Sequence, residues 1–398
     1  MKIRVYRGQN QIGGNIVEIS TDNTKILLDM GTELNQKVEE SPEIANLFTN
    51  GNYDAVFVSH YHLDHMGLAY GIGSKIPLYI GEGSYKIVRA ADNYKALKTI
   101  SPAGFLVHKV PVYVGDIKVT PFLCDHSAYD SYMLLVESDG ENALYTGDFR
   151  SSGRKSFDRL LMDLPVNINT LICEGTTLSR GDIIPQTETD LENKAVELFK
   201  HTEEPIFVLM SSMNIDSIVT VYRTAVKCKR LMLQDLYMAE ITSAIGGNIP
   251  NPQFFPKVRA FITRGYDNND PRYDLFKKYG MKRISKAGII QSDFVMCVRS
   301  SMLNYLTSLS RKMSFKGGLL VYSLWTGYKD QTEMKEFILG CTNLGLEIVD
   351  LHTSGHAEAE TVRALVKHVN PAKILPIHTE NAAWFRREYG NRIPSYYE

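Results

Sequence analysis

DAVFVSHYHLDH, residues 54–65, is the stretch of sequence that decides the fold. Its first six residues form a short, almost continuously apolar run, which is typical of a buried strand. Four potential metal ligands follow within six residues: His60, His62, Asp64 and His65. Imidazole and carboxylate groups are the ligands that zinc prefers in catalytic sites. The stretch therefore predicts a loop that serves two adjacent metal positions, with a hydrophilic surface loop as the alternative.

Further acidic and histidine residues each follow an apolar, strand-like run: Asp29, His126, Asp148, Glu174 and His378. Open α/β sheets assemble their sites at the carboxyl ends of strands, so these side chains could converge on one pocket. Any one of them could instead be a turn residue that ends a strand. Their occurrence together with the histidine-rich loop favours a common site.

The composition is that of an ordinary globular protein, with 44% hydrophobic and 22% charged residues. A length of 398 residues predicts one large or two medium domains. The 44 basic and 45 acidic side chains leave a net charge of −1, which gives no overall attraction to nucleic acid or membrane. Nucleic acid would therefore have to bind through a local basic groove.

The five cysteines are scattered along the chain and form no CxxC pair. This disfavours a disulfide framework and a cysteine zinc site, and it suits a reducing compartment. No stretch approaches the ~18 consecutive apolar residues typical of a transmembrane helix. We therefore expect a cytoplasmic protein that does not contact a membrane.

The hydrophobic pattern changes character after Glu174, from short strands with tight turns to alternating strands and helices, which is typical of parallel α/β units. Strands are predicted at 16–20, 25–29, 54–59, 133–137, 143–146, 170–173, 205–210, 318–322 and 373–377. Helices are predicted at 190–201, 215–226, 331–339 and 362–369. The segment 248–274 is rich in Pro, Asn and Asp and is expected to be loop.

The order of these motifs resembles that of the metallo-β-lactamase superfamily: HxHxDH at 60–65, preceded by Asp29 and followed by His126 and Asp148. Three later motifs resemble those of its β-CASP branch: Glu174 in CEGT, His356 in HTSGHAEAE and His378 in LPIHTE. That branch acts on nucleic acids and includes ribonuclease J-like RNA-processing nucleases. The resemblance extends over nearly the whole chain, from about residue 1 to residue 382.

The resemblance implies an α/β fold, an αββα metallo-β-lactamase sandwich interrupted by an inserted α/β β-CASP domain. The first part of the sandwich would comprise residues 1–184 and the insert residues 185–325. Residues 326–398 would then return to the sandwich and complete its sheet.

The resemblance also implies a site with two zinc ions, or other divalent metals. One ion would be held by His60, His62 and His126, and the other by Asp64, His65 and His378, with Asp148 bridging the two. Asp29 would orient a ligand loop through hydrogen bonds. Two such metals lower the pKa of a shared water and make hydroxide available at neutral pH, so Asp64 is counted as catalytic as well as a ligand.

Two further residues are assigned to catalysis by the same resemblance. His356 would donate a proton to the leaving oxygen, or steady charge in the transition state, because the pKa of histidine lies near neutrality. Glu174 would hold an imidazole in position, most plausibly that of His356. The alternative for His356 is a helix N-terminal residue that merely follows Gly355.

The predicted function is that of a zinc-dependent ribonuclease with RNA, most plausibly single-stranded, as its partner. A histidine at the last motif, here His378, goes with RNA-processing members of the branch. The alternatives are a small-molecule hydrolase of lactonase or thioesterase type and a non-catalytic RNA-binding protein. A homo-oligomer is compatible with the sequence.

Basic clusters could contact phosphates or could be solvated surface: Arg150, Arg154 and Lys155, and Lys227, Lys229 and Arg230. The segment 211–214, between a predicted strand and helix, could offer amides to a phosphate. Capping of that helix is the favoured interpretation.

Overall fold

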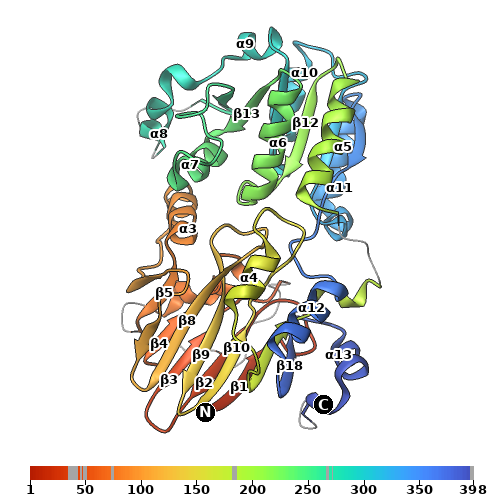
Figure 1. Cartoon of the computed structure of the whole chain (residues 1–398). Coiled ribbons are helices and arrows are strands. Elements are labelled where there is room, and N and C mark those ends of the chain that lie inside the picture. The colour runs from red at the N-terminus through yellow and green to blue at the C-terminus, as the bar shows by residue number, and fades with distance from the viewer. Residues whose placement is uncertain are drawn as a thin grey trace. The chain divides into compact units, whose positions relative to one another are not determined.

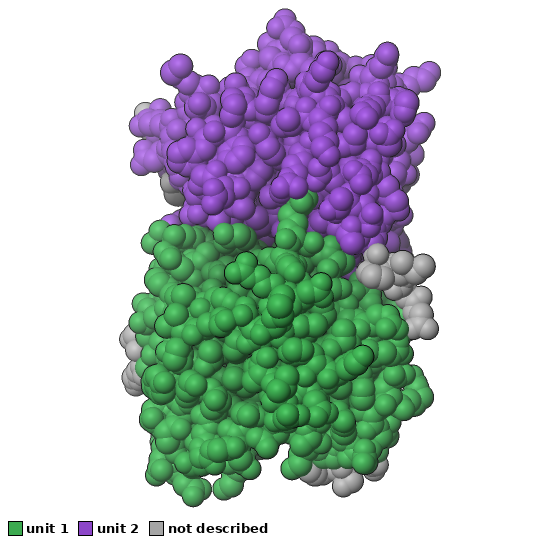
Figure 2. All heavy atoms as spheres, in the orientation of Figure 1, with its two compact units in different colours: residues 1–89, 98–185, 355–398 green, residues 90–97, 186–354 purple. Residues whose placement is uncertain are grey.

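The computed structural model describes residues 1–34, 44, 47, 52–72, 76–181, 186–265, 269–270 and 272–394. The chain divides into two compact units, coloured separately in Figure 2. Unit 1 comprises residues 1–89, 98–185 and 355–398, and unit 2 comprises residues 90–97 and 186–354. No helix among the described residues has the length and apolarity needed to cross a membrane.

The first sheet of unit 1 has its strands in chain order, β1-β2-β3-β4-β5-β6 (Figure 1). Neighbouring strands are antiparallel from β1 to β3 and parallel from β3 to β6. The strands are β1 Lys2–Arg7, β2 Ile16–Ser20, β3 Lys25–Leu28, β4 Ala55–Phe57, β5 Leu78–Gly81 and β6 Gly104–Leu106.

The second sheet of unit 1 has the order β18-β11-β10-β9-β8-β7. Strands β7 to β10 are antiparallel, whereas β10, β11 and β18 are parallel. The strands are β7 Val112–Val114, β8 Ile117–Cys124, β9 Ser131–Ser138, β10 Glu141–Tyr145, β11 Thr170–Glu174 and β18 Lys373–Ile377.

One hydrophobic core joins the two sheets of unit 1. It contains Val17 and Phe57 from the first sheet and Leu134 and Leu144 from the second, all fully buried. Side chains from the inner faces of two sheets pack in this way in a β-sandwich. Among the described residues of unit 1, the helices are α2 Leu63–Met66, α3 Glu82–Lys95, which continues into unit 2, α4 Phe157–Asp163, α12 Ala359–Val369 and α13 Ala382–Tyr389.

Unit 2 contains a parallel sheet with the order β14-β13-β15-β12-β16-β17. Its strands are β12 Ile206–Met210, β13 Leu231–Asp235, β14 Val258–Phe261, β15 Phe294–Val298, β16 Leu319–Ser323 and β17 Glu347–Asp350. Its helices are α5 Glu188–Lys200, α6 Ile215–Lys227, α7 Leu236–Ile245, α8 Tyr273–Lys278, α9 Lys286–Ile290, α10 Leu303–Ser310 and α11 Thr332–Asn343. The predicted parallel α/β unit is confirmed.

Two expectations differ from the structure. The segment 248–274 is not all loop, because β14 lies within it and pairs with β13. That strand depends on a distant partner rather than on its own short sequence. The chain also does not return to the sandwich at residue 326. Residues 326–354 belong to unit 2, where β17 extends the sheet by pairing with β16.

Candidate metal centre

The histidine-rich loop is fixed to the first sheet through its backbone. Strand β4 is completely buried, and the chain leaves it to enter α2 at Leu63. The carbonyl oxygen of Asp64 accepts from the amide of Asn15 at 3.0 Å, and that of His65 accepts from the amide of Met30 at 2.7 Å. These bonds hold a helix of only one turn, which would be marginal alone.

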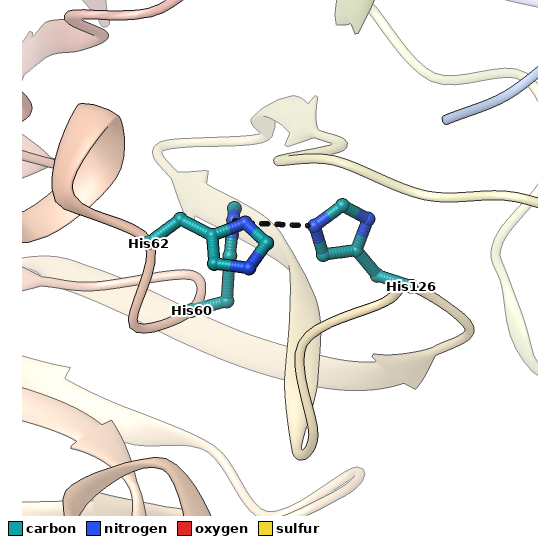
Figure 3. A group of neighbouring side chains, drawn as sticks. All are labelled: His60, His62 and His126. Carbon is teal, nitrogen blue, oxygen red and sulfur yellow. Dashed lines mark hydrogen bonds between the residues drawn. The ribbon is translucent and has the colours of Figure 1, made fainter. Parts of the chain in front are cut away.

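Three imidazoles form the first group of candidate ligands: His60, His62 and His126 (Figure 3). The Nδ1 atom of His62 lies 3.2 Å from the Nε2 atom of His60 and 3.2 Å from the Nε2 atom of His126. His126 comes from the end of β8, in the other sheet. The sandwich therefore brings together histidines that are more than sixty residues apart in sequence.

A second group contains Asp64, His65 and His378. The Nε2 atom of His378 lies 3.2 Å from Oδ2 of Asp64, and Nε2 of His65 lies 4.0 Å from the same oxygen. Asp148 lies between the two groups. Its Oδ2 atom is 3.1 Å from Nε2 of His65 and 3.7 Å from Nε2 of His60.

Two buried atoms indicate that this arrangement fits a metal ion. The Nε2 atom of His65 and the Oδ1 atom of Asp148 have no hydrogen-bond partner within the part of the chain that the structure describes. Both residues are at most 1% exposed. A buried polar atom without a partner is costly, and a bound cation would satisfy both.

The pKa values of the first group favour metal binding. Burial and the neighbouring imidazoles hold the pKa of His60 well below its usual value. Burial lowers the pKa of His126 as well, and it lowers that of His62 to about 4. All three imidazoles are therefore neutral at physiological pH, the form in which histidine binds a metal.

Around His65 the balance is reversed. Burial lowers its pKa, but the carboxylates of Asp148, Asp29 and Asp64 raise it by more, so the net shift is upward. Burial raises the pKa of Asp148, but the imidazoles of His378 and His65 outweigh it and hold that pKa low. These carboxylates create a place where positive charge is stabilised, whether it is a proton or a metal ion.

Both carboxylate oxygens of Asp29 contact the histidine-rich loop and the residue just before it. Its Oδ1 atom accepts from the amide of Ser59 at 2.7 Å. Its Oδ2 atom lies 2.7 Å from Nδ1 of His65 and accepts from the Tyr145 hydroxyl at 2.6 Å. A carboxylate that accepts a hydrogen bond from one ring nitrogen of a histidine fixes the ring and leaves the other nitrogen free to bind a metal.

Glu174 and His356 also adjoin this centre. The Nδ1 atom of His356 lies 3.2 Å from Oε2 of Glu174 and 3.5 Å from Oδ2 of Asp148. Burial lowers the pKa of His356, but the two carboxylates raise it by more, to about 9. The His356 side chain is 22% exposed, whereas that of Glu174 is fully buried, so only the histidine is open to a substrate.

Three residues that support the site are not identified by sequence reasoning: Gly31, Tyr145 and Thr176. An added Cβ on Gly31 would lie 1.7 Å from the carbonyl oxygen of Asp64. Thr176 stands in the CEGT motif, but its contacts with Glu174 and His378 arise only in the folded chain.

Neither alternative for Arg150, phosphate contact or solvated surface, agrees with the structure, because its side chain is completely buried and its Nε atom lies 3.3 Å from Oδ2 of Asp125. This ion pair joins the loops of His126 and Asp148, because Asp125 precedes the first and Arg150 follows the second by two residues. Arg230 is likewise buried and donates to carbonyl groups. In the segment 211–214, Asn214 caps α6 by accepting from the amide of Ser217, as favoured.

Comparisons with known proteins find two family models and several relatives that resemble this chain. The family model described as "Metallo-beta-lactamase superfamily" matches residues 10–190, and that described as "Zn-dependent metallo-hydrolase RNA specificity domain" matches residues 343–393. The chain is 24% identical to a probable RNase MJ4 of Methanocaldococcus jannaschii, over 94% of this chain and 92% of that protein. It is 21% identical to a ribonuclease J of Helicobacter pylori, over 96% of this chain and 56% of that protein.

A solved structure of a protein of unknown function from Enterococcus faecalis V583 has a similar fold. Its TM-score is 0.76 at 21% identity, over 96% of this chain and 94% of that one. These matches support the resemblance to the metallo-β-lactamase superfamily and, within it, to its β-CASP, ribonuclease J-like branch. The predicted sandwich with an inserted α/β domain is confirmed.

Replacing Gly31 by alanine should displace the loop that carries Asp64. The new methyl group would overlap the Asp64 carbonyl, which is backbone and cannot turn away. We expect metal affinity to fall by at least about tenfold, as when the support of a ligand is lost. Metal titration checks this, with Gly280→Ala as the control, since a methyl group there meets open space. Equal affinity in both variants would contradict the close approach at Gly31.

Replacing Arg150 by methionine should destabilise unit 1 by about 3 kcal/mol, because the buried Asp125 carboxylate loses a buried cation and is left with the partly exposed Lys155 at 3.8 Å among its contacts. Urea unfolding followed by Trp384, a unit 1 residue, in a Trp325→Phe background measures this. Arg159→Met, on the exposed side of α4, is the matched control. If both variants lost the same stability, the ion pair would not hold the loops.

Proposed function

We propose that the chain is a metal-dependent ribonuclease that hydrolyses RNA phosphodiester bonds with two divalent cations, zinc foremost. The observation that carries the proposal is the convergence of two ligand groups on one carboxylate, that of Asp148. Oxygen atoms of Asp148 lie within 4 Å of His60 and His126 from the first group and of His65 and His378 from the second. Two groups that share a bridging oxygen ligand are typical of paired metal sites in hydrolases.

In this proposal each cation has its own set of ligands. His60, His62 and His126 would hold one ion, and Asp64, His65 and His378 would hold the other, with Asp148 between them. When bound, such a pair supplies hydroxide near neutral pH and neutralises charge on phosphoryl oxygens. Asp29 keeps His65 in place from below.

His356 is the proposed proton donor to the leaving oxygen. Its raised pKa keeps the imidazole protonated at neutral pH, and its side chain is partly exposed beside Asp148. Glu174 would position His356 and also hold the loop that carries Asp148, as its contacts indicate. It faces Nδ1 of His356, and its Oε1 atom accepts from the Phe149 amide at 2.9 Å, next to Asp148.

RNA is the proposed substrate because the RNA specificity model covers residues 343–393, which include His356 and His378. Relatives over nearly the whole chain are named as ribonucleases. We propose single-stranded RNA, since a flexible strand can bring one phosphodiester to ligands whose side chains are mostly buried. The five free thiols suit a cytoplasmic location.

Replacing His60 by alanine should remove metal and RNA cleavage together. The side chain is completely buried in the ligand group, and its loss leaves too few nitrogens to hold that ion. We expect at least one equivalent of metal to be lost, measured by elemental analysis, and cleavage to fall below detection. His201→Ala, at the exposed end of α5, should keep both.

The substrate is tested separately with metal-loaded protein and RNA that is single-stranded, double-stranded or circular. Cleavage of single strands is expected, and chelation of the metal should abolish it. Protein that holds two metals yet cuts neither RNA nor single-stranded DNA would overturn the ribonuclease proposal. It would leave the hydrolysis of a small molecule as the better interpretation.

Replacing His356 by alanine should slow the chemical step by about 10²–10⁴-fold, the usual contribution of a general acid. Metal content should stay at the wild-type value, because the other ligands remain. Single-turnover cleavage, measured beside elemental analysis, separates the two effects. A His356→Ala protein that turned over at the wild-type rate would exclude this residue as the proton donor.

A further inference from the structure

Thr176 stands between two of the site residues. It follows β11 at the start of a 3-10 turn, Thr176–Ser179, and is 2% exposed. Its Oγ1 atom lies 2.8 Å from Oε2 of Glu174 and 2.7 Å from Nδ1 of His378. Its amide also donates to Oε2 of Glu174, at 3.3 Å. The threonine therefore links a carboxylate from β11 to a histidine from the end of β18.

The chemistry of the three groups decides where the hydrogens lie. A hydroxyl has one hydrogen and can also accept, whereas a carboxylate can only accept. The 2.8 Å contact between Thr176 and Glu174 therefore uses the hydroxyl hydrogen. The backbone carbonyl of His378, at 3.1 Å, is a competing acceptor, but a charged acceptor makes the stronger bond. The hydroxyl oxygen is then left to accept from Nδ1–H of His378.

This arrangement determines which nitrogen of His378 can bind a metal. A neutral imidazole carries one hydrogen, so a proton on Nδ1 leaves the lone pair on Nε2. The Nε2 atom faces Oδ2 of Asp64 at 3.2 Å, within the second ligand group. A lone pair and a carboxylate repel each other unless a cation lies with them. The hydrogen bonds from His378 through Thr176 to Glu174 therefore favour the protein with a metal ion bound.

The backbone of His378 is fixed separately from its ring. Its φ is +53°, in the left-handed region that side chains other than glycine seldom adopt. Its amide donates to the carbonyl of Gly8 at 2.8 Å, which holds the main chain but not the ring. The ring orientation is set by what its two nitrogens meet, and Thr176 meets one of them.

We propose that Thr176 is a positioning residue, whose hydroxyl joins His378 to Glu174 and fixes the imidazole tautomer that presents Nε2 to the metal. This inference rests on the proposed metal site and deepens it. Glu174 then serves two histidines with one carboxylate, His356 directly and His378 through Thr176.

Three variants test the hydroxyl itself. Thr176→Val keeps the shape but removes the hydroxyl, and Thr176→Ser keeps the hydroxyl. Thr177→Val is the matched control, because Thr177 is buried in the same turn but donates to the carbonyl of Ala357. Metal affinity is measured with zinc and a competing chromophoric chelator. Thr176→Val should bind one of two zinc ions about 10–100-fold more weakly, and the other two variants should stay near wild type.

A second measurement needs no variant. In zinc-loaded wild-type protein, ¹⁵N chemical shifts of the His378 ring should show Nδ1 protonated and Nε2 bound to metal. Metal bound through Nδ1 would overturn the proposal even if Thr176→Val did not fold. So would wild-type zinc affinity in Thr176→Val, or an equal loss in Thr177→Val. Wild-type protein that bound no metal would instead refute the proposed metal site.

Discussion

Negative charge buried at the ends of strands is the constraint on which the site depends. Asp29, Asp148 and Glu174 are each at most 1% exposed. A carboxylate buried without partners would be strongly destabilising, so each must be surrounded by donors or cations. Asp29 obtains amide, hydroxyl and imidazole donors. Asp148 keeps an oxygen, Oδ1, that accepts no hydrogen bond from the described residues, so a bound cation there would offset the cost of its burial.

The sandwich meets this constraint by placing the ends of strands from both sheets around one centre. The loop after β4 in the first sheet carries His60, and the loop after β8 in the second carries His126. The buried pair of Asp125 and Arg150 then holds the His126 and Asp148 loops together. Support of this kind matters because ligand atoms must stay within a few tenths of an ångström of their places.

The part of the site that sequence could predict is the part that is local. The loop at 60–65 has its candidate ligands side by side in the chain, and the acidic and histidine residues that follow strands can be recognised one by one. Partners such as Tyr145 and Thr176 could not, because their roles depend on contacts across more than a hundred residues. The buried ion pair of Arg150 is not evident for the same reason, since an arginine in a sequence does not show which carboxylate it will contact.

The fold showed the same division between local and distant causes. Hairpins and amphipathic helices follow from short-range patterns, and β2 with β3 and β9 with β10 were predicted in this way. Strand β14 and the limit of unit 2 were not, because both depend on pairing with strands elsewhere in the chain. A short segment with only a weak preference for strand becomes a strand when tertiary contacts provide a neighbouring strand to pair with.

The same division separates His378 from the candidate ligands of the 60–65 loop. Strand β18 pairs with β11 across the whole of the inserted segment, and it leads directly to His378. Closing so long a loop costs entropy that grows only slowly with length, as about (3/2)RT ln n. Unit 2 has a sheet and a core of its own, so the inserted segment is itself folded rather than a flexible loop. The place of His378 in the site therefore depends on a strand pairing that no short stretch of sequence specifies.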